Sequence, residues 1–217
     1  MSDAVVDARR LCDVLKGVAQ DLKERAEELR QLDAQLGDGD LGVTVELSCR
    51  AMSEYLASTT ETDTGRLLTQ CGLSVNRLSP STFGTILATA FLGAGKAATG
   101  KTQLTAADLA LAGNGAIESI KRRGKAEVGD KTVLDALAPA VQAFEKEWSL
   151  GSDIATALNC AVEAAECGMR ATAGMQAKFG RARWFQDRSI GIQDAGATAM
   201  YFMVESFARN LRLLEAS

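Results

Sequence analysis

The feature that most constrains this chain is a spacing of apolar residues by three and four that recurs along almost its whole length. One such stripe runs through residues 8–29 and another through 197–214, as on one face of a helix. Further helical segments are predicted at 43–58, 64–77, 82–98, 105–123, 133–148 and 152–176. Only two prolines occur in 217 residues, and alternating β-branched runs are nearly absent. The sequence therefore predicts an all-α, antiparallel arrangement of about eight amphipathic helices without a strand.

The composition excludes several classes of function. The formal net charge is −4, so we expect no nucleic-acid partner, because non-specific binding needs a basic face. The chain has no histidine, which excludes Ser-His-Asp and Cys-His catalysis, His-ligated zinc and a phosphohistidine carrier. Five cysteines without a CxxC pair indicate reduced thiols. With no apolar run long enough for a signal core or a membrane span, we expect a cytoplasmic protein with one domain over residues 1–217.

The segment LDAQLGDGDLG is the densest in chemistry. Asp33, Asp38 and Asp40 lie within eight residues, among glycines that permit tight turns. Carboxylates this close repel one another unless they stay solvated or a cation lies between them, and their hard oxygens suit Mg²⁺ or Ca²⁺. An EF-hand does not fit, because its glycine and glutamate positions would be Val43 and Cys49. A metal site and a polar turn with helix-capping aspartates both remain open.

Other segments have the composition of a phosphate site. Residues 95–102, GKAATGKT, match the phosphate-loop pattern, but a helical stripe precedes them and no parallel sheet is predicted, which favours a solvated turn. Residues 121–132 are rich in lysine and arginine, and arginines alternate with aromatic residues in 179–196. Residues 79–82, SPST, are typical of a helix start with free N–H groups. Each of these segments is equally typical of ordinary helix capping.

Taken in order, four motifs resemble the L subunit of dihydroxyacetone kinase, a DAK2-type (DhaL-like) nucleotide-binding domain. They are LDAQLGDGDLG, SPSTFGT, RGKAEVGDKTVLDAL and GRARWFQDRSIGIQDAGAT. The resemblance covers nearly the whole chain and implies an up-and-down barrel of about eight amphipathic helices. It also implies that helix-end loops bind ADP or ATP through a pair of Mg²⁺ ions, with Asp33, Asp38 and Asp40 as the metal ligands.

The same resemblance implies a set of nucleotide-binding residues. They flank the motifs quoted above and are Leu41, Gly42, Thr44, Leu78, Ser79, Gly124, Val133, Arg181, Asp194 and Gly196. Beyond the metal site, no catalytic side chain is expected on this chain. The chain departs from the family pattern where Leu41 replaces a histidine, Pro80 a glycine and Ala195 a proline. These departures point to a ketotriose or ketotetrose other than dihydroxyacetone.

Phosphoryl transfer is the activity that the resemblance implies. In the family, a histidine on a separate K-type subunit holds the ketose, and this chain has no histidine, so we expect a K-type partner at the nucleotide end. The phosphoryl donor is either ATP or a phosphotransferase-system protein that rephosphorylates bound ADP, and a homodimer is open. Two other functions remain: a non-catalytic, nucleotide-sensing or regulatory module, whose apolar barrel interior would admit a lipid tail, and a P-loop enzyme.

Overall fold

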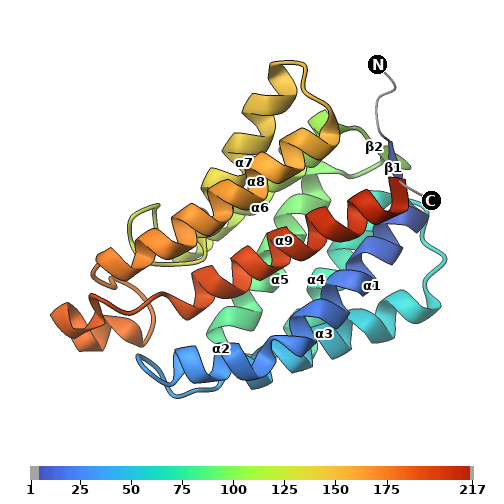
Figure 1. The fold of residues 1–217 in the computed structure, drawn as a ribbon. Coiled ribbons are helices and arrows are strands. Elements are labelled where there is room, and N and C mark those ends of the chain that lie inside the picture. Colours follow the sequence, from blue (N-terminus) through green and yellow to red (C-terminus); the bar gives the residue numbers. More distant parts are fainter. Residues whose placement is uncertain (1–4, 216–217) are drawn as a thin grey trace.

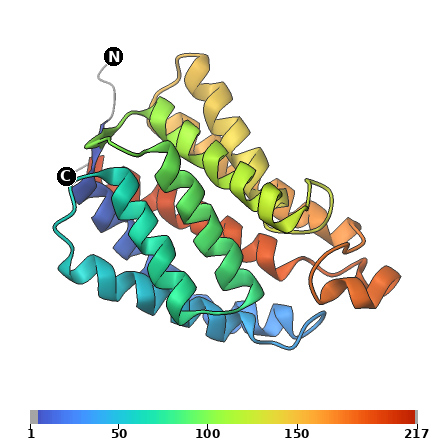
Figure 2. The same ribbon diagram turned by 180° about the vertical axis from the view of Figure 1, so that it is seen from behind.

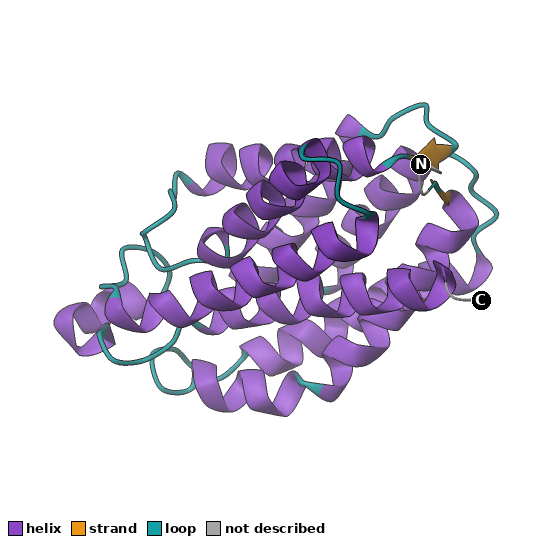
Figure 3. Ribbon diagram, turned by 45° about the horizontal axis from the view of Figure 1, so that its top comes forward, coloured by secondary structure: helices purple, strands orange, loops and turns teal. Residues whose placement is uncertain are grey.

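The computed structural model describes residues 5–215, which are helical almost throughout (Figures 1 and 3). Of the expected domain 1–217, residues 1–4 and 216–217 lie outside this part. The α-helices are α1 (Ala8–Glu24), α2 (Ala26–Asp33), α3 (Leu41–Ser58), α4 (Thr64–Leu78), α5 (Thr82–Ala97), α6 (Ala106–Gly124), α7 (Leu134–Ser149), α8 (Ile154–Ala171) and α9 (Ala195–Glu215). The shorter elements are strands β1 (Val6–Asp7) and β2 (Gln103–Leu104) and 3₁₀ helices η1 (Thr172–Gly174) and η2 (Ala182–Ser189).

The long helices form a closed ring. In the described chain α1 packs on α3, each helix from α3 to α8 packs on the next one, and α9 returns to α1 (Figures 1 and 2). The short helix α2 lies against α3 and α9. Short connections make successive helices antiparallel. The prediction of an all-α, up-and-down barrel with about eight long helices is therefore confirmed.

The inward faces of the helices account for the apolar spacing of the sequence. On α1, Leu11, Leu15, Val18 and Leu22 are all buried. The helices enclose an apolar cavity of about 240 Å³ that is lined by side chains from α1, α4 to α9 and β2. None of the described helices has the combination of length and apolar character that a bilayer-crossing helix needs.

Polar contacts close the ring between its first and last helices. The Asp21 carboxylate of α1 accepts hydrogen bonds from Ser206 and Asn210 of α9, and it pairs with Arg209. Gly17 lies so close to Asn210 that a Cβ at residue 17 would be 2.1 Å from the Asn210 Oδ1 atom. The α1–α9 seam therefore depends on a small residue on one helix and a hydrogen-bonded carboxylate one turn further along it.

The prediction of one helix through residues 8–29 is wrong, because the chain breaks at Arg25. Arg25 has φ −92° and ψ 0°, which ends α1 and lets α2 start in a new direction. Ala26 is buried there, and a Cβ on Gly42 would lie 2.4 Å from the Ala26 carbonyl oxygen. One non-helical residue leaves the apolar spacing almost unchanged, so the sequence pattern did not reveal the break.

Several helix starts have the capping residues that the sequence indicates. The expected capping box of α6 is confirmed, because the side chains of Thr105 and Asp108 each accept the other residue's N–H. Asp153 caps α8 by accepting the Thr156 N–H. Helix α8 stops at residue 171, before the expected 176, where the chain tightens into η1. No strand was expected, and within residues 5–215 the structure adds only the pair of two-residue strands β1 and β2.

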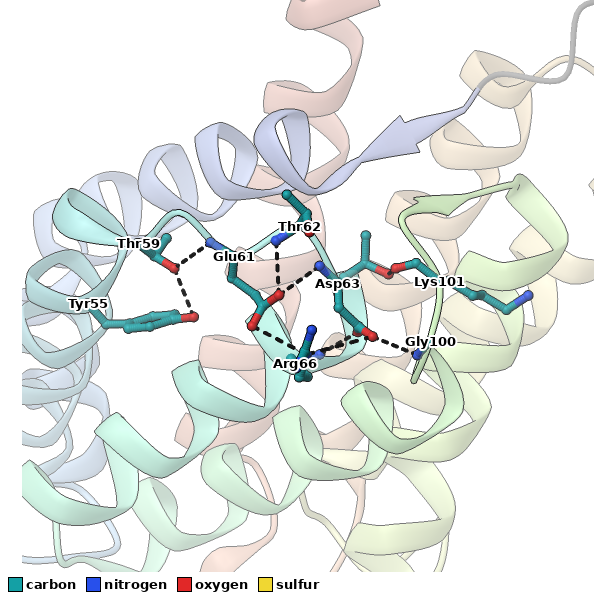
Figure 4. Close-up of polar contacts among 9 residues, drawn as sticks. Tyr55, Thr59, Glu61, Thr62, Asp63, Arg66, Gly100 and Lys101 are labelled. Carbon is teal, nitrogen blue, oxygen red and sulfur yellow. Dashed lines mark hydrogen bonds and ion pairs between the residues drawn. The ribbon is translucent and has the colours of Figure 1, made fainter.

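The GKAATGKT segment is not a phosphate loop. Helix α5 leads into it where a strand would be required. The polar groups of the segment make hydrogen bonds and an ion pair at the end of the barrel near β1 and β2 (Figure 4). The Gly100 N–H donates to the Asp63 carboxylate at 2.8 Å, and the Lys101 carbonyl accepts the Thr64 N–H at 2.8 Å. The Lys101 ammonium pairs with Asp108 at 3.1 Å. The alternative of a P-loop enzyme therefore has no structural support in the described residues.

Candidate functional site

A cavity of about 760 Å³ opens at the other end of the barrel, to the left in Figure 1. Helices α3, α5, α7 and α9 all begin at this end. Residues at all four starts line the cavity, namely Leu41, Thr82, Val133 and Ala195. The unpaired N–H groups of a helix start carry partial positive charge. The alternating direction of the helices thus brings four such starts to one cavity, which favours a bound anion.

An acidic cluster forms part of the cavity wall. Asp33 ends α2 and Asp40 precedes α3, and one carboxylate oxygen from each, together with one from Asp38, lies within 4.8 Å of the others. Glycine permits this geometry, because a Cβ on Gly37 would lie 2.6 Å from the Asp33 Oδ1 atom and Gly39 has φ +72°. The Asp40 side chain makes no capping hydrogen bond, so helix capping does not account for its carboxylate.

A guanidinium group is the cation closest to these carboxylates. Arg181, at the start of η2, pairs with Asp38, and its Nη1 atom lies 3.9 Å from the Asp40 Oδ2 atom. The side chains of all three residues are partly exposed to solvent. The convergence of the three carboxylates fits a divalent metal site, since hard oxygen donors suit Mg²⁺. Arg181 offsets part of their negative charge in this structure.

An apolar wall completes the cavity. Phe83 and Ile86 of α5, Ile120 of α6, Val133 and Phe179 line it and belong to one apolar cluster. This wall can pack against a flat ring of a ligand, while the carboxylates and helix starts can bind its charged groups.

The sequence-predicted residues divide into two groups. Nine line the cavity: Asp33, Asp38, Asp40, Leu41, Gly124, Val133, Arg181, Asp194 and Gly196. The other four, Gly42, Thr44, Leu78 and Ser79, do not line it. The Ser79 hydroxyl is buried and donates to the Thr44 carbonyl at 3.2 Å, and residues 80–82 line the cavity in its neighbourhood.

Comparisons with known proteins agree with this arrangement. Residues 35–209 match the DAK2 domain. The chain belongs to the DAK2 domain family. It is 32% identical over 183 residues to the ADP-binding subunit DhaL of the PEP-dependent dihydroxyacetone kinase of Escherichia coli, covering 84% of this chain and 87% of that protein. It is also 32% identical over 209 residues to the D-erythrulose kinase of Mycolicibacterium smegmatis, covering 95% of this chain and 36% of that one.

The fold of this DAK2 domain is also found in a solved structure. The dihydroxyacetone kinase of C. freundii superposes with a TM-score of 0.71 at 23% identity, covering 92% of this chain and 34% of that one. The same kinase has been solved in complex with AMP-PNP and Mg²⁺. This DAK2 domain spans about a third of the length of the C. freundii and M. smegmatis kinases and most of the E. coli subunit.

Several cavity residues of the DAK2 domain were not among those predicted. Ser81 and Thr82 belong to the α5 start, which the SPST motif had indicated as a helix start. Arg123 and Lys131 come from the basic segment. Gln193 carries no signal in the sequence, because an isolated glutamine is ordinary in a loop.

Asp194 gives the DAK2 domain a measurable pH dependence. Burial raises the pKa of this carboxyl group from 3.8 to about 6, although the carboxylate accepts the Ala197 N–H at 2.7 Å. A raised carboxyl pKa means that the folded state favours the neutral acid, so this group lowers stability as the pH rises from about 4 through 6.

We therefore expect Asp194→Asn to be more stable than the wild type at pH 8, since asparagine keeps an acceptor for the Ala197 N–H without the charge. The advantage should largely vanish at about pH 3, where Asp194 is mostly protonated in both states because that pH lies below 3.8 as well as below the raised pKa. Thermal unfolding without nucleotide or Mg²⁺ at the two pH values measures it. An equal difference in melting temperature at both would contradict the assignment.

Proposed function

We propose that this DAK2 domain is the nucleotide-binding subunit of a dihydroxyacetone-kinase-like phosphotransferase. It would bind ADP or ATP with Mg²⁺ and deliver the phosphoryl group to a short ketose, a triose or tetrose, held on a separate K-type subunit. We further propose that residues 1–217 form one domain and that the protein is cytoplasmic. The names of its relatives and the free state of all five cysteines support these assignments.

The observation that carries the proposal is the pairing of opposite electrostatic features in one cavity. Three carboxylates converge on one side, and four helix starts, including those of α5 and α9, face the same space. A nucleotide polyphosphate with its metal ions needs both, since the cations bind carboxylates and the phosphate oxygens bind N–H groups. The adjoining apolar wall suits a base.

The residues of the chain have distinct tasks in this proposal. Asp33, Asp38 and Asp40 would hold two Mg²⁺ ions, which offset negative charge on the phosphates during transfer. Arg181 would turn from Asp38 to the phosphates, where a guanidinium stabilises the charge of a loose transition state. Gly124 and Val133, which line the cavity, would contact the base. Because such catalysis consists mainly of positioning and charge, it requires no histidine on this chain.

Titration calorimetry tests the proposal. The purified protein, freed of any co-purified nucleotide, is titrated with ATP and with ADP, each with and without Mg²⁺. Mg²⁺-dependent binding supports the proposal, and no binding of either nucleotide overturns it. Phosphoryl transfer to a ketose in the presence of the K-type subunit, with ATP or a phosphotransferase-system protein as donor, then separates a kinase subunit from a nucleotide-sensing module. Light scattering of the same sample tests for a homodimer.

The partner is proposed to dock beside η2, which extends beyond the barrel at the lower left of Figure 1. Trp184 is 74% exposed there, with the Arg183 guanidinium 4.7 Å from its ring centroid. The segment follows residues 180–182 of the cavity wall, so a subunit that brings a ketose to the cavity passes over it. Tryptophan and arginine are the residue types that contribute most to binding at interfaces.

We expect Trp184→Ala to weaken the complex with the K-type subunit about 30-fold, since a central tryptophan contributes about 2 kcal/mol. Affinity for Mg–ATP should stay unchanged. Leu150→Ala is the matched control, because Leu150 is 69% exposed in the α7–α8 turn at the opposite end. Equal affinity of wild type and Trp184→Ala for the K-type subunit would exclude this docking site.

A further inference from the structure

Lys131 occupies an unfavourable position in two respects. Its backbone has φ +63°, a left-handed conformation in which side chains with a Cβ are disfavoured and glycine is common. Its side chain is only 2% exposed, which removes an ammonium group from water. Residues retained in such conformations cluster at functional sites.

The Lys131 ammonium group donates all of its protons to backbone carbonyls of one segment. The Lys131 Nζ atom donates to the carbonyl oxygens of Met175 at 3.1 Å, Ser189 at 2.6 Å and Ile192 at 2.5 Å. An ammonium group has three protons, so these bonds leave none for a ligand. Lys131 therefore cannot bind a phosphate without giving up one of these carbonyls.

The three carbonyls belong to the segment that carries Arg181. Residues 175–192 leave η1, pass through η2 and return to the start of α9, folding around the Lys131 ammonium. Additional bonds hold the same segment, since Lys178 pairs with Asp130 at 2.7 Å and the Ala177 N–H donates to the Ser189 hydroxyl at 3.0 Å. Arg181 directly precedes η2 and belongs to none of the described α-helices, so its place beside the carboxylates depends on these contacts within the segment.

We propose that Lys131 is a positioning residue for nucleotide binding: by joining three carbonyls of residues 175–192, it holds Arg181 at the acidic cluster and fixes the approach to α9. The inference rests on the proposed function. It assigns Lys131 an effect that is transmitted through Arg181 and its segment and not through a contact with the nucleotide.

The first test is Lys131→Met, which keeps the apolar stem and removes all three donors. Calorimetry should show Mg–ATP binding weakened about 10- to 100-fold, as expected when a binding group is displaced by about 1 Å. Amide exchange should accelerate within residues 175–192 while the barrel helices stay protected. If Lys131→Met does not fold, Lys131→Gln replaces it, because a glutamine amide keeps two donors but is too short to reach all three carbonyls.

The decisive test is a double-mutant cycle with Arg181→Ala. If Lys131 acts by placing Arg181, the double variant should bind Mg–ATP no more than about two-fold more weakly than the weaker single variant. If the loss of affinity in the double variant equalled the product of the two single losses, the inference would be overturned, because Lys131 would then act independently of Arg181. Wild-type affinity in Lys131→Met would overturn it as well. Asp21→Asn, in the α1–α9 seam, is the control for general destabilisation and should keep wild-type affinity. Failure of the wild type to bind would instead refute the proposed function.

Discussion

Asp38→Ala is expected to abolish Mg²⁺-dependent nucleotide binding and to leave the helical fold intact. The carboxylate belongs to a cluster whose oxygens converge within 4.8 Å, and its removal leaves two of the three oxygen donors. Loss of a residue that only hydrogen-bonds to a metal ligand lowers metal affinity or activity about 10- to 100-fold. We therefore expect a loss of at least about 100-fold for a direct ligand. Calorimetry with Mg–ATP gives the affinity, and circular dichroism gives the helix content.

The control for this variant is Asp13→Ala. Asp13 is an aspartate on the surface of α1 that pairs only with Lys16 in the described contacts, at 3.2 Å, and it should be neutral for nucleotide binding. Surface pairs of this kind also contribute little to stability. If Asp38→Ala bound Mg–ATP as tightly as the wild type, the acidic cluster would not be the metal site.

Gly168→Ala is expected to destabilise the fold by about 2–4 kcal/mol, at the upper end of the range for overpacking. A Cβ at residue 168 of α8 would lie 1.9 Å from the Asp135 carbonyl oxygen of α7, and backbone cannot move aside as a side chain can. The close approach has a cause in the sequence. Pro139, four residues after Asp135, has no N–H to donate to that carbonyl, so α8 can approach α7 at this point.

Thermal unfolding measures this effect, and for a chain of this length we expect the melting temperature to fall by about 5–15 °C. Gly174→Ala is the matched control, because no atom lies within 4 Å of a Cβ at that position and its φ is not positive. An unchanged melting temperature in Gly168→Ala would mean that α7 and α8 are further apart in solution.

The sequence predicted the barrel well because each helix turns one face to a single closed core. Spacing by three and four residues records that face directly, so the bounds of α3 to α7 differ little from those expected. The break at Arg25 was invisible because it interrupts the hydrogen bonding and not the spacing. The sequence did not reveal that α8 ends at residue 171, because the glycine and small residues that follow are compatible with a helix.

The candidate site was predictable only where its residues are adjacent in sequence. The aspartates from Asp33 to Asp40 stand out because three like charges crowd one short loop. The role of Lys131 could not be read from its neighbours, since its partners lie 44 to 61 residues further along the chain. The direction of the Ser79 side chain depends likewise on α3, because its hydroxyl donates a hydrogen bond to the Thr44 carbonyl.

The positions of β1 and of the end of α9 limit how this barrel can be joined to other domains. Strand β1 and the end of α9 lie together at the end opposite the cavity (Figure 1). Helix α9 has 21 residues and is about 30 Å long. A tether would need about nine extended residues to bring a fused domain back to the cavity mouth. A fusion through a shorter tether would therefore deliver its cargo to the cavity of a neighbouring molecule, so that linker length alone would decide between action within one polypeptide and action between two.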